Sequence, residues 1–502
     1  MSFAFDNSFA RELPGFYVKW QPEQVPGPRL LYLNHALAAE LGLNLSQHDE
    51  AALAAMLSGN RLPEGADPIA QAYAGHQFGR FSPQLGDGRA LLIGELIDCH
   101  GTRRDIAFKG SGPTPFARNG DGKAAVGPML REVLIGEAMH ALGIPTTRAL
   151  AVVTTGEPVH REKILPGATL TRVAVSHIRV GTFEYYAARG DHDRVRKLAD
   201  YAIARHDPGL IGGNGRYLDF LSAVMERQAA LIAQWMGVGF IHGVMNTDNM
   251  SIAGETIDYG PCAFMEAYDP KAVFSSIDTH GRYAYENQPR IAQWNLARLA
   301  ESLLPLLADD EQEAVALATE LIASFPDRYR RYWLNVMRAK LGINGRVCNG
   351  DDDDIALVEE WLALLQRNKV DFTLAWRYLA DAAERKPSPL RSLFSDQLAL
   401  NAWLKKWQAR CAAENGHTDA NESRTAESIR AQTMRKSNPW LIPRNHCVED
   451  ALSAASDEND FGAFEQLLEV LGTPHEEHAG FVRFAKPAPE SFTASYCTFC
   501  GT

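Results

Sequence analysis

The sequence of 502 residues predicts an α+β fold with two lobes, a β-rich lobe followed by a helical one. Two observations predict this order. Residues 68–155 hold short apolar runs separated by glycine-rich turns, which is typical of strands and hairpins. From about residue 184 the apolar residues follow helical patterns instead. We expect an N-terminal extension at 1–60, a β-rich upper lobe at 61–160, a helical lower lobe at 161–415 and a C-terminal extension at 416–502.

The composition excludes several classes of protein. A formal net charge of -12 argues against a general surface for nucleic acid or anionic membrane, since both favour an excess of Lys and Arg. No run of 18 apolar residues exists, and the N-terminus lacks the pattern of a signal peptide. The seven cysteines are sparse, which favours a reducing compartment. We therefore expect a cytoplasmic protein, and no feature suggests a symmetric interface, so we expect a monomer.

The β-rich half begins after one helix predicted in the extension. The extension helix is expected at 27–43, and a second helix at 128–143 starts with Pro128 and ends at Gly143, standard start and stop signals. We expect strands at 90–96, 105–109, 148–153 and 163–175, and a hinge between the lobes at 154–159. Residues 113–127 form a loop that is too long and glycine-rich for a plain connection.

The second half is predicted to be helical. Helices are expected at 184–205, 217–237, 288–307, 310–324, 326–341, 354–367, 370–385 and 395–414, and a polar linker at 415–425 precedes helices at 424–434 and 446–471. The acidic run Asp351–Asp354 lacks the alternating ligands and central glycine of a calcium loop, so we interpret it as the charged N-terminus of a helix.

The segment 240–262 is the centre of the predicted fold. It is expected to form a strand, a polar loop, a second strand and a turn, and it carries Asn246, Asp248, Asn249 and Asp258. Their side-chain oxygens are of the kind that Mg²⁺ takes when it also holds substrate phosphates. A catalytic loop followed by Asp-aromatic-Gly, here Asp258-Tyr259-Gly260, is the layout of protein kinases. The predicted fold is therefore a bilobal, protein-kinase-like one.

The kinase pattern fails at one informative position. With His242 aligned to the kinase histidine, Asn249 falls on the metal-binding Asn, but the catalytic Asp falls on Val244, which cannot accept a proton. Either the chain lacks kinase chemistry or the base has moved. Asp248 is the carboxylate of this loop and the candidate base.

Basic and glycine residues upstream suggest a triphosphate site. Lys109 ends a predicted strand after a glycine-rich turn, and a kinase-like fold needs a helical Glu to hold such a Lys; we favour Glu132, with Glu137 as the alternative. Arginine suits bidentate contact with phosphate. The candidate nucleotide residues are Gly86, Gly88, Arg89, Lys109, Asp121, Gly122, Glu132, Arg172 and Arg179. Asp121 and Gly122 could equally form a simple turn.

The chain ends in a C-x-x-C pair, Cys497 and Cys500. Two histidines with similar spacing, His475 and His478, make a zinc site conceivable. A redox-active dithiol at the tail is the reading that we favour.

Several long motifs carry a resemblance to a known family. They are QAYAGHQFGRFSPQLGDGRALLIGE, KGSGPTPFARNGDGKA, PMLREVLIGEAMHALGIPTTRAL, FIHGVMNTDNMSIAGETIDYGP and the terminal C-x-x-C, and they span residue 70 to the C-terminus. With these motifs the chain resembles the selenoprotein O (SelO) family of kinase-like protein adenylyltransferases. Vertebrate members carry selenocysteine in the terminal motif, where this chain has two cysteines.

The resemblance implies an activity and residue roles. Family members bind ATP in a flipped orientation and transfer AMP to Ser, Thr or Tyr hydroxyls of proteins, which would explain Val244. It makes Asp248 the proton acceptor and assigns Mg²⁺, with Mn²⁺ possible, to Asn249 and Asp258. The nine candidate nucleotide residues named above would bind ATP. Redox control through the tail is also implied, with Cys262 as a hypothetical disulfide partner.

Three other functions stay open at this point. A true kinase with a displaced base would transfer the γ-phosphate, a catalytically inactive pseudokinase would only bind nucleotide, and a purely redox protein would need only the tail cysteines. The sequence names neither the protein substrate nor the preferred nucleotide.

Overall fold

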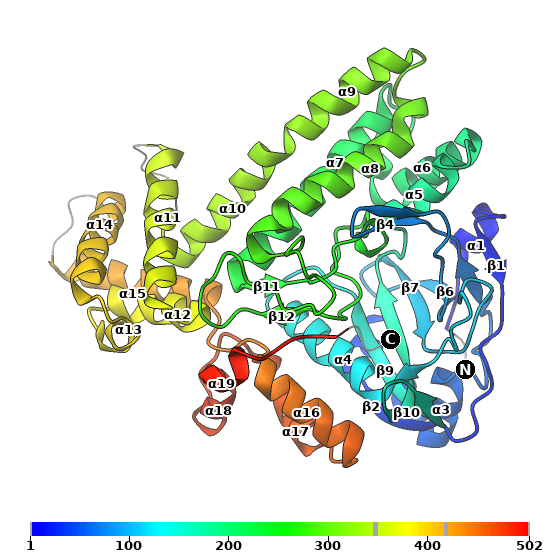
Figure 1. Ribbon diagram of the computed structural model, residues 1–502, viewed down its shortest axis with the longest axis horizontal. Helices are drawn as coiled ribbons and strands as arrows, with labels where there is room; N and C mark the ends of the chain where they lie inside the picture. The colour runs from blue at the N-terminus through cyan, green and yellow to red at the C-terminus, as the bar shows by residue number, and fades with distance from the viewer. Residues whose placement is uncertain (1–2, 345–349, 416–419, 500–502) are drawn as a thin grey trace.

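The computed structural model describes residues 3–344, 350–415 and 420–499. One antiparallel sheet of eight strands forms the first part (Figure 1), in the order β1-β3-β6-β7-β10-β9-β2, with β8 paired to β10. Its strands are β1 (Tyr17–Lys19), β2 (Arg29–Leu33), β3 (Ile69–Gln71), β6 (Ala90–Ile97), β7 (Arg103–Lys109), β8 (Ala124–Ala125), β9 (Arg148–His160) and β10 (Ile164–Ala174). Two small hairpins pair β4 (Gly75–Gln77) with β5 (Arg80–Ser82) and β11 (Phe240–Ile241) with β12 (Ala263–Phe264).

Helices make up most of the remainder, so the predicted α+β class is correct. They are α1 (Ser8–Glu12), α2 (His35–Glu40), α3 (Glu50–Leu57), α4 (Val126–Ala141), α5 (Val180–Ala187), α6 (His192–His206), α7 (Arg216–Val238), α8 (Gln288–Leu307), α9 (Glu311–Ala323), α10 (Phe325–Leu341), α11 (Asp351–Asn368), α12 (Phe372–Ala383), α13 (Ser388–Ser392), α14 (Gln397–Asn415), α15 (Ala420–Ser437), α16 (Asn445–Asp457), α17 (Gly462–Leu471), α18 (Val482–Ala485) and α19 (Glu490–Thr493). The long helices α7 to α10 lie on the opposite side of the 240–264 segment from the sheet (Figure 1).

The strands predicted around Lys109 are confirmed. Lys109 is the last residue of β7, opposite Ala90 of β6 and Leu170 of β10. The predicted helix at 128–143 is α4, which packs on β9 and is covered by α16 and α17. Because β7 ends in the middle of the sheet and α4 lies against it, Lys109 and Glu132 are brought together from different elements.

Two predictions in the β-rich half are wrong. The helix expected at 27–43 is strand β2 followed by the short helix α2, because the apolar Leu30–Leu33 run pairs with β9. The Asn34 side chain then accepts a hydrogen bond from the Leu37 N–H and caps α2. The hinge expected at 154–159 lies inside β9, where Thr154 pairs with Ala168 and Val159 with Leu165.

Several boundaries in the helical half also differ. The helix expected at 184–205 is two helices, since the chain turns at Gly190 and Asp191 caps α6. The helix expected at 446–471 is likewise α16 and α17. The polar linker expected at 415–425 is wrong over residues 420–425, which belong to α15, while residues 416–419 lie outside the described residues. The acidic run does start a helix, α11, as predicted.

The central segment is a wider loop than the predicted hairpin. β11 pairs with β12, so the second strand expected near 250–257 is wrong. Residues 250–256 instead bond to two distant segments: for example, Val180 N–H donates to the Met250 carbonyl, and Thr256 N–H donates to the Pro145 carbonyl. These bonds fix the loop between the sheet and the helices.

One apolar core runs through both parts of the chain. It joins Leu92 and Leu170 of the sheet to Leu134 of α4 and on to Leu231 and Leu296 of the long helices. A second cluster covers the other face of the sheet with α2 and α3. In the described part of the chain, no helix is both long and apolar enough to cross a membrane.

A buried arginine attaches the C-terminal segment to this body. Arg444 is fully buried, and its guanidinium lies 2.6 Å from Glu266 Oε2 and 2.6 Å from Asp371 Oδ2. It also donates to the Ala485 carbonyl at 3.0 Å. The two carboxylates belong to the central loop region and to the start of α12, so this one cation links three segments.

We predict that Arg444→Met lowers the free energy of unfolding by about 3–5 kcal/mol, because two buried carboxylates lose their counter-ion. Urea denaturation measures the change. Arg385→Met is the matched control, since Arg385 pairs with Glu427 at the surface and such pairs contribute about 0–1 kcal/mol. Equal losses in the two variants would contradict the prediction.

Candidate active site

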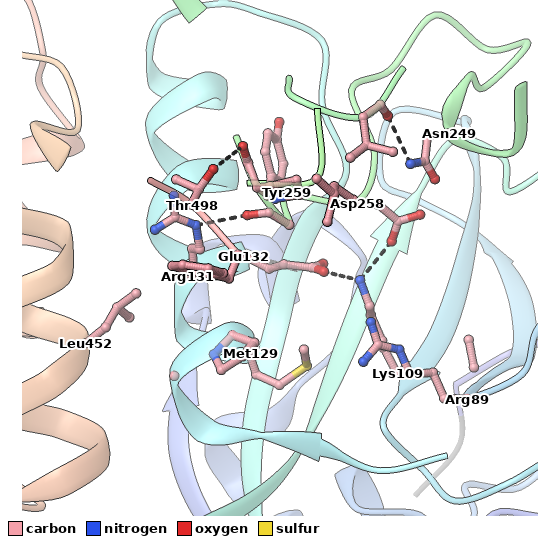
Figure 2. A pocket seen from close by; sticks show the side chains of 18 of the residues that line it. Arg89, Lys109, Met129, Arg131, Glu132, Asn249, Asp258, Tyr259, Leu452 and Thr498 are labelled. Atoms are coloured by element: carbon pink, nitrogen blue, oxygen red, sulfur yellow. Dashed lines mark hydrogen bonds and ion pairs between the residues drawn. The ribbon is translucent and has the colours of Figure 1, made fainter. Parts of the chain in front are cut away.

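A cavity of about 630 Å³ lies between the sheet, α4, the central loop and the C-terminal tail. Figure 2 shows side chains from all four meeting there. Most of the site residues predicted from the sequence line it: Gly88, Arg89, Lys109, Glu132, Arg172, Arg179, Asp248, Asn249, Asp258 and Cys497. The fold therefore gathers into one cavity residues that are as far apart in the sequence as Gly88 and Cys497.

Lys109 lies between two carboxylates. Its ammonium donates to Glu132 Oε1 and, at 2.8 Å, to Asp258 Oδ1 (Figure 2). The pairing expected between the strand Lys and a helical Glu is thus present with Glu132. The alternative, Glu137, instead pairs with Arg148 and accepts from Asn34.

Asp258 is contacted by three cations. Besides Lys109, Arg172 donates to Oδ1 at 2.6 Å and Arg179 donates to Oδ2 at 3.2 Å. Burial alone would raise the pKa of Asp258, but these positive charges hold it well below its ordinary value of 3.8. Its backbone has φ +64°, a left-handed conformation that costs a non-glycine residue about 1–3 kcal/mol. The surrounding cations stabilise the carboxylate in that position.

Asp248 has a different environment, although it lies ten positions away in the same loop. Its side chain is buried, Oδ2 accepts a long 3.4 Å hydrogen bond from Gln77, and among the described residues Oδ1 has no hydrogen-bond partner. Burial raises the pKa of Asp248 from 3.8 to about 6, although the charge of Arg179 opposes the shift. Arg179 also donates to the Asp248 backbone carbonyl at 2.8 Å. A carboxyl with this pKa can accept a proton near neutral pH.

The oxygen ligands at this cavity fit a hard divalent cation. Asn249 uses its amide N–H₂ to donate to the Val244 carbonyl at 3.0 Å, which leaves its carbonyl oxygen available (Figure 2). The carboxylate of Asp258 supplies further oxygens of the type that Mg²⁺ takes. Within the described ranges, no group of three or more His, Cys, Asp or Glu side chains could hold a metal by itself. Any such ion would therefore need oxygens from the bound nucleotide as well.

Three predicted nucleotide residues do not line the cavity. Asp121 forms an exposed ion pair with Arg161 at 2.7 Å. Gly122 packs against the Gly112–Pro113 backbone, where a Cβ would lie 2.2 Å from the Gly112 carbonyl carbon. Gly86 packs on the Phe116 ring with φ +75°, so it shapes the turn that presents Gly88. Their proposed roles in nucleotide binding stay predictions.

The tail reaches the cavity, but only part of the C-x-x-C pair can be described. Cys497 lines the cavity, and its thiol donates to the Phe274 carbonyl at 3.1 Å. Thr498 Oγ1 donates to the Pro261 carbonyl at 2.7 Å, beside the hypothetical partner Cys262 (Figure 2). Cys262 is fully buried, which raises the pKa of its thiol to about 11. Cys500 lies outside the described residues, and so does the zinc site that would include it.

Known proteins match the chain over most of its length. The family model for protein adenylyltransferase SelO matches residues 1–472. The chain belongs to the SelO family. It is 60% identical over 491 residues to the protein nucleotidyltransferase YdiU of Chromobacterium violaceum, covering 98% of this chain and 100% of that protein. Proteins of the same name from Cereibacter sphaeroides strain KD131 and Rhizobium johnstonii are 58% and 55% identical, covering 100% of this chain and 100% and 98% of theirs.

Sequence reasoning missed several residues of this SelO-family site. Asp87 lines the cavity, and burial raises its pKa to about 6. Asp87 lies between Gly86 and Gly88 of the predicted turn, and this position could have identified it as a candidate site residue. Arg131 precedes Glu132 and donates to the carbonyls of Gly260 and Cys262. No local pattern could have revealed Arg131, because its partners are about 130 residues away.

His177 is a further missed residue, and it orients Arg172. Arg172 Nε donates to His177 Nε2 at 3.3 Å. Because arginine can only donate, Nε2 must be the acceptor, and Nδ1 therefore carries the proton that it donates to Asp105 at 2.9 Å. Asp105 is in turn held by Arg205 at 2.6 Å. The neutral imidazole thus connects the sheet to the arginine that contacts Asp258.

We predict that His177 and His206 each destabilise the fold as the pH is lowered from 6.5 to about 4, relative to variants that lack them. Burial, aided by the charge of Arg172, lowers the pKa of His177 from 6.5 to about 4, and burial lowers that of His206 to about 3. In this window the unfolded chain binds protons that the folded chain does not, so acid favours unfolding.

Urea denaturation at several pH values measures the effect. Each such histidine adds a slope of up to about 1.4 kcal/mol per pH unit, which His177→Gln should remove. His206→Gln should remove a similar slope. A His177→Gln variant that keeps the full slope of the parent protein would contradict the assignment of a neutral His177.

Proposed function

We propose that the chain transfers AMP from ATP to Ser, Thr or Tyr hydroxyls of proteins and releases pyrophosphate. The observation that carries the proposal is the cavity itself: Lys109, Arg172 and Arg179 converge on Asp258, and Asp248 lies beside them with a pKa near 6. Membership of the SelO family and the printed name of its relatives, protein nucleotidyltransferase, support the same reaction class.

In the proposed reaction a protein hydroxyl attacks the α-phosphorus of ATP. A new oxygen–phosphorus bond forms, the bond from the α-phosphorus to the bridging oxygen breaks, and pyrophosphate leaves with the electron pair. Asp248 accepts the hydroxyl proton. Lys109, Arg172 and Arg179 stabilise the negative charge on the phosphates. Asn249 and Asp258 would hold Mg²⁺ or Mn²⁺, which supplies further charge neutralisation when bound.

We also propose that ATP binds in the reversed orientation known for the family, within a kinase-like fold whose lobes comprise 61–160 and 161–415, flanked by extensions at 1–60 and 416–502. The ion pair of Lys109 with Glu132 and the proximity of Asp258 support this arrangement. The valine at position 244, where kinases have the catalytic base, also supports the reversed orientation. A reversed nucleotide would present its α-phosphate for reaction, so the base need not lie at the kinase position. The cytoplasm and the monomeric state remain proposals that rest on composition.

Redox control by Cys497 and Cys500 is part of the proposal. Its support is the position of the tail, since Cys497 and Thr498 line the same cavity as Asp258. The buried, protonated Cys262 could pair with a tail cysteine only after the local structure opens, because a thiolate is the reactive form. Thus we expect oxidation to act slowly on the folded protein.

The decisive experiment is incubation of the purified protein with Mg²⁺ and ATP labelled at the α- or at the γ-phosphate, followed by a denaturing gel. We predict self-modification from the α-label alone, and a weaker signal after oxidation with hydrogen peroxide than after treatment with dithiothreitol. Label from γ alone would establish a kinase with a displaced base. Binding of ATP without label under reducing conditions would favour a pseudokinase.

The roles of the two aspartates separate in variants. Asp248→Asn should lower turnover by about 10²–10⁴-fold while nucleotide affinity is kept, because it removes only the proton acceptor. In the Asp258→Asn variant, the nucleotide affinity should no longer depend on Mg²⁺. Isothermal titration calorimetry with and without the ion measures this affinity. Unchanged turnover in Asp248→Asn would show that another group is the base.

A further inference from the structure

The β4–β5 hairpin is bound residue by residue to the catalytic loop. Phe78 N–H donates to Asn246 Oδ1 at 3.0 Å, and His76 N–H donates to Thr247 Oγ1 at 2.7 Å. Gln77 donates to Asp248 Oδ2. Three consecutive residues of the hairpin thus contact three consecutive residues of the loop that holds the proposed base.

The hairpin lies so close to its neighbours that two glycine positions leave no room for a side chain. A Cβ on Gly75 would lie 2.6 Å from Asp248 Oδ1, and one on Gly181 of α5 would lie 2.1 Å from the Ala74 carbonyl oxygen. Glu184 of α5 adds a further link, because it bonds to both His76 Nδ1 and Thr247 Oγ1. The hairpin therefore has a fixed position relative to Asp248, and its residues Gln77 and Phe78 line the cavity.

The far end of the hairpin is exposed, basic and aromatic. Arg80 is exposed, and the neighbouring Phe81 is 40% exposed, with its ring 4.9 Å from that of His76. Arg282 lies against Gly79 at the hairpin turn and over the Trp294 ring. Arg189 donates to the Pro83 carbonyl just after β5. We call this surface, made of Arg80, Phe81, Arg189 and Arg282, the hairpin face.

The arginines of the hairpin face lack acidic partners. Among the described residues, none of Arg80, Arg189 and Arg282 forms an ion pair, whereas Arg298 nearby pairs with Glu301. The chain as a whole carries 62 acidic against 50 basic residues, so this cluster of arginines contrasts with the net charge of the protein. The arginines of the hairpin face are also distinct from the basic residues of the cavity, since none of the three lines it.

We propose that the hairpin face binds the acceptor protein through an acidic segment next to the hydroxyl that is modified. The inference rests on the proposed function. A segment that places its hydroxyl at Asp248 meets Gln77 and Phe78 at the cavity and then Arg80 and Phe81 beyond it. Arginine binds carboxylates in bidentate fashion, and the exposed Phe81 ring offers apolar contact to the same segment. The preferred substrates are therefore hydroxyls flanked by Asp or Glu.

The test uses three synthetic peptides of equal length with one Tyr or Ser, flanked by Glu, by Ala or by Lys, and ATP labelled at the α-phosphate. We expect the KM of the Glu peptide to be roughly tenfold below that of the Lys peptide, which corresponds to one or two favourable charge pairs. Arg80→Glu should raise the KM of the Glu peptide roughly fivefold and lower that of the Lys peptide, with ATP affinity unchanged. Phe81→Ala should raise the KM of all three peptides.

Arg61→Glu is the matched control, because Arg61 is exposed and forms no ion pair within the part of the chain that the structure describes. It follows α3, which lies at the opposite end of the sheet from β4 (Figure 1). It changes the net charge equally and should leave every KM unchanged. Equal KM values for the Glu and Lys peptides, or equal effects of Arg80→Glu and Arg61→Glu, would overturn the docking proposal. So would α-label on the protein itself but on no peptide. Absence of α-label on both protein and peptides would instead overturn the proposed function, and the docking proposal with it.

Discussion

The Asp258 carboxylate is the interaction on which the site depends. Lys109 comes from the sheet, Arg172 from the neighbouring strand β10 and Arg179 from the residue that precedes α5, and all three meet at this one side chain. Without its charge, three buried cations would repel one another in a small volume. The left-handed backbone of Asp258 is the conformational cost of placing the carboxylate there. If the proposed function is right, a polyanionic nucleotide would take over part of this neutralisation when it binds.

Helix α4 is held by contacts at both of its faces. Glu132 faces Lys109, and the preceding Arg131 donates to the carbonyls after Asp258 and pairs with Glu449 of α16 at 3.0 Å. Glu449 also accepts a hydrogen bond from Tyr496 at 2.8 Å, just before Cys497. The C-terminal segment is therefore in physical contact with helix α4, and two hydrogen-bonded steps connect Tyr496 to Arg131, the neighbour of the residue that pairs with Lys109.

Much of this arrangement could be predicted from local patterns. The strands that carry Lys109 and Arg172 follow from short apolar runs between turn residues, and α4 follows from Pro128 and Gly143. Predictions failed where distant pairing decides the structure. Leu30–Leu33 joins β9 as a strand, and residues 250–257 bond to Pro145 and Val180 instead of forming a strand of their own. Arg131, His177 and Gln77 could not be found by spacing, because each has a hydrogen-bond partner that is 72 or more positions away in the sequence.

The shared core has a consequence for the chain as a whole. Because Leu92, Leu134 and Leu231 belong to one continuous cluster, neither the sheet nor the helices possess a complete apolar interior of their own. Strand β9 continues through the position where a flexible connection was expected, so the chain is not hinged there. Unfolding of the sheet would therefore expose apolar surface of the long helices as well, and we expect the two parts to lose their structure together.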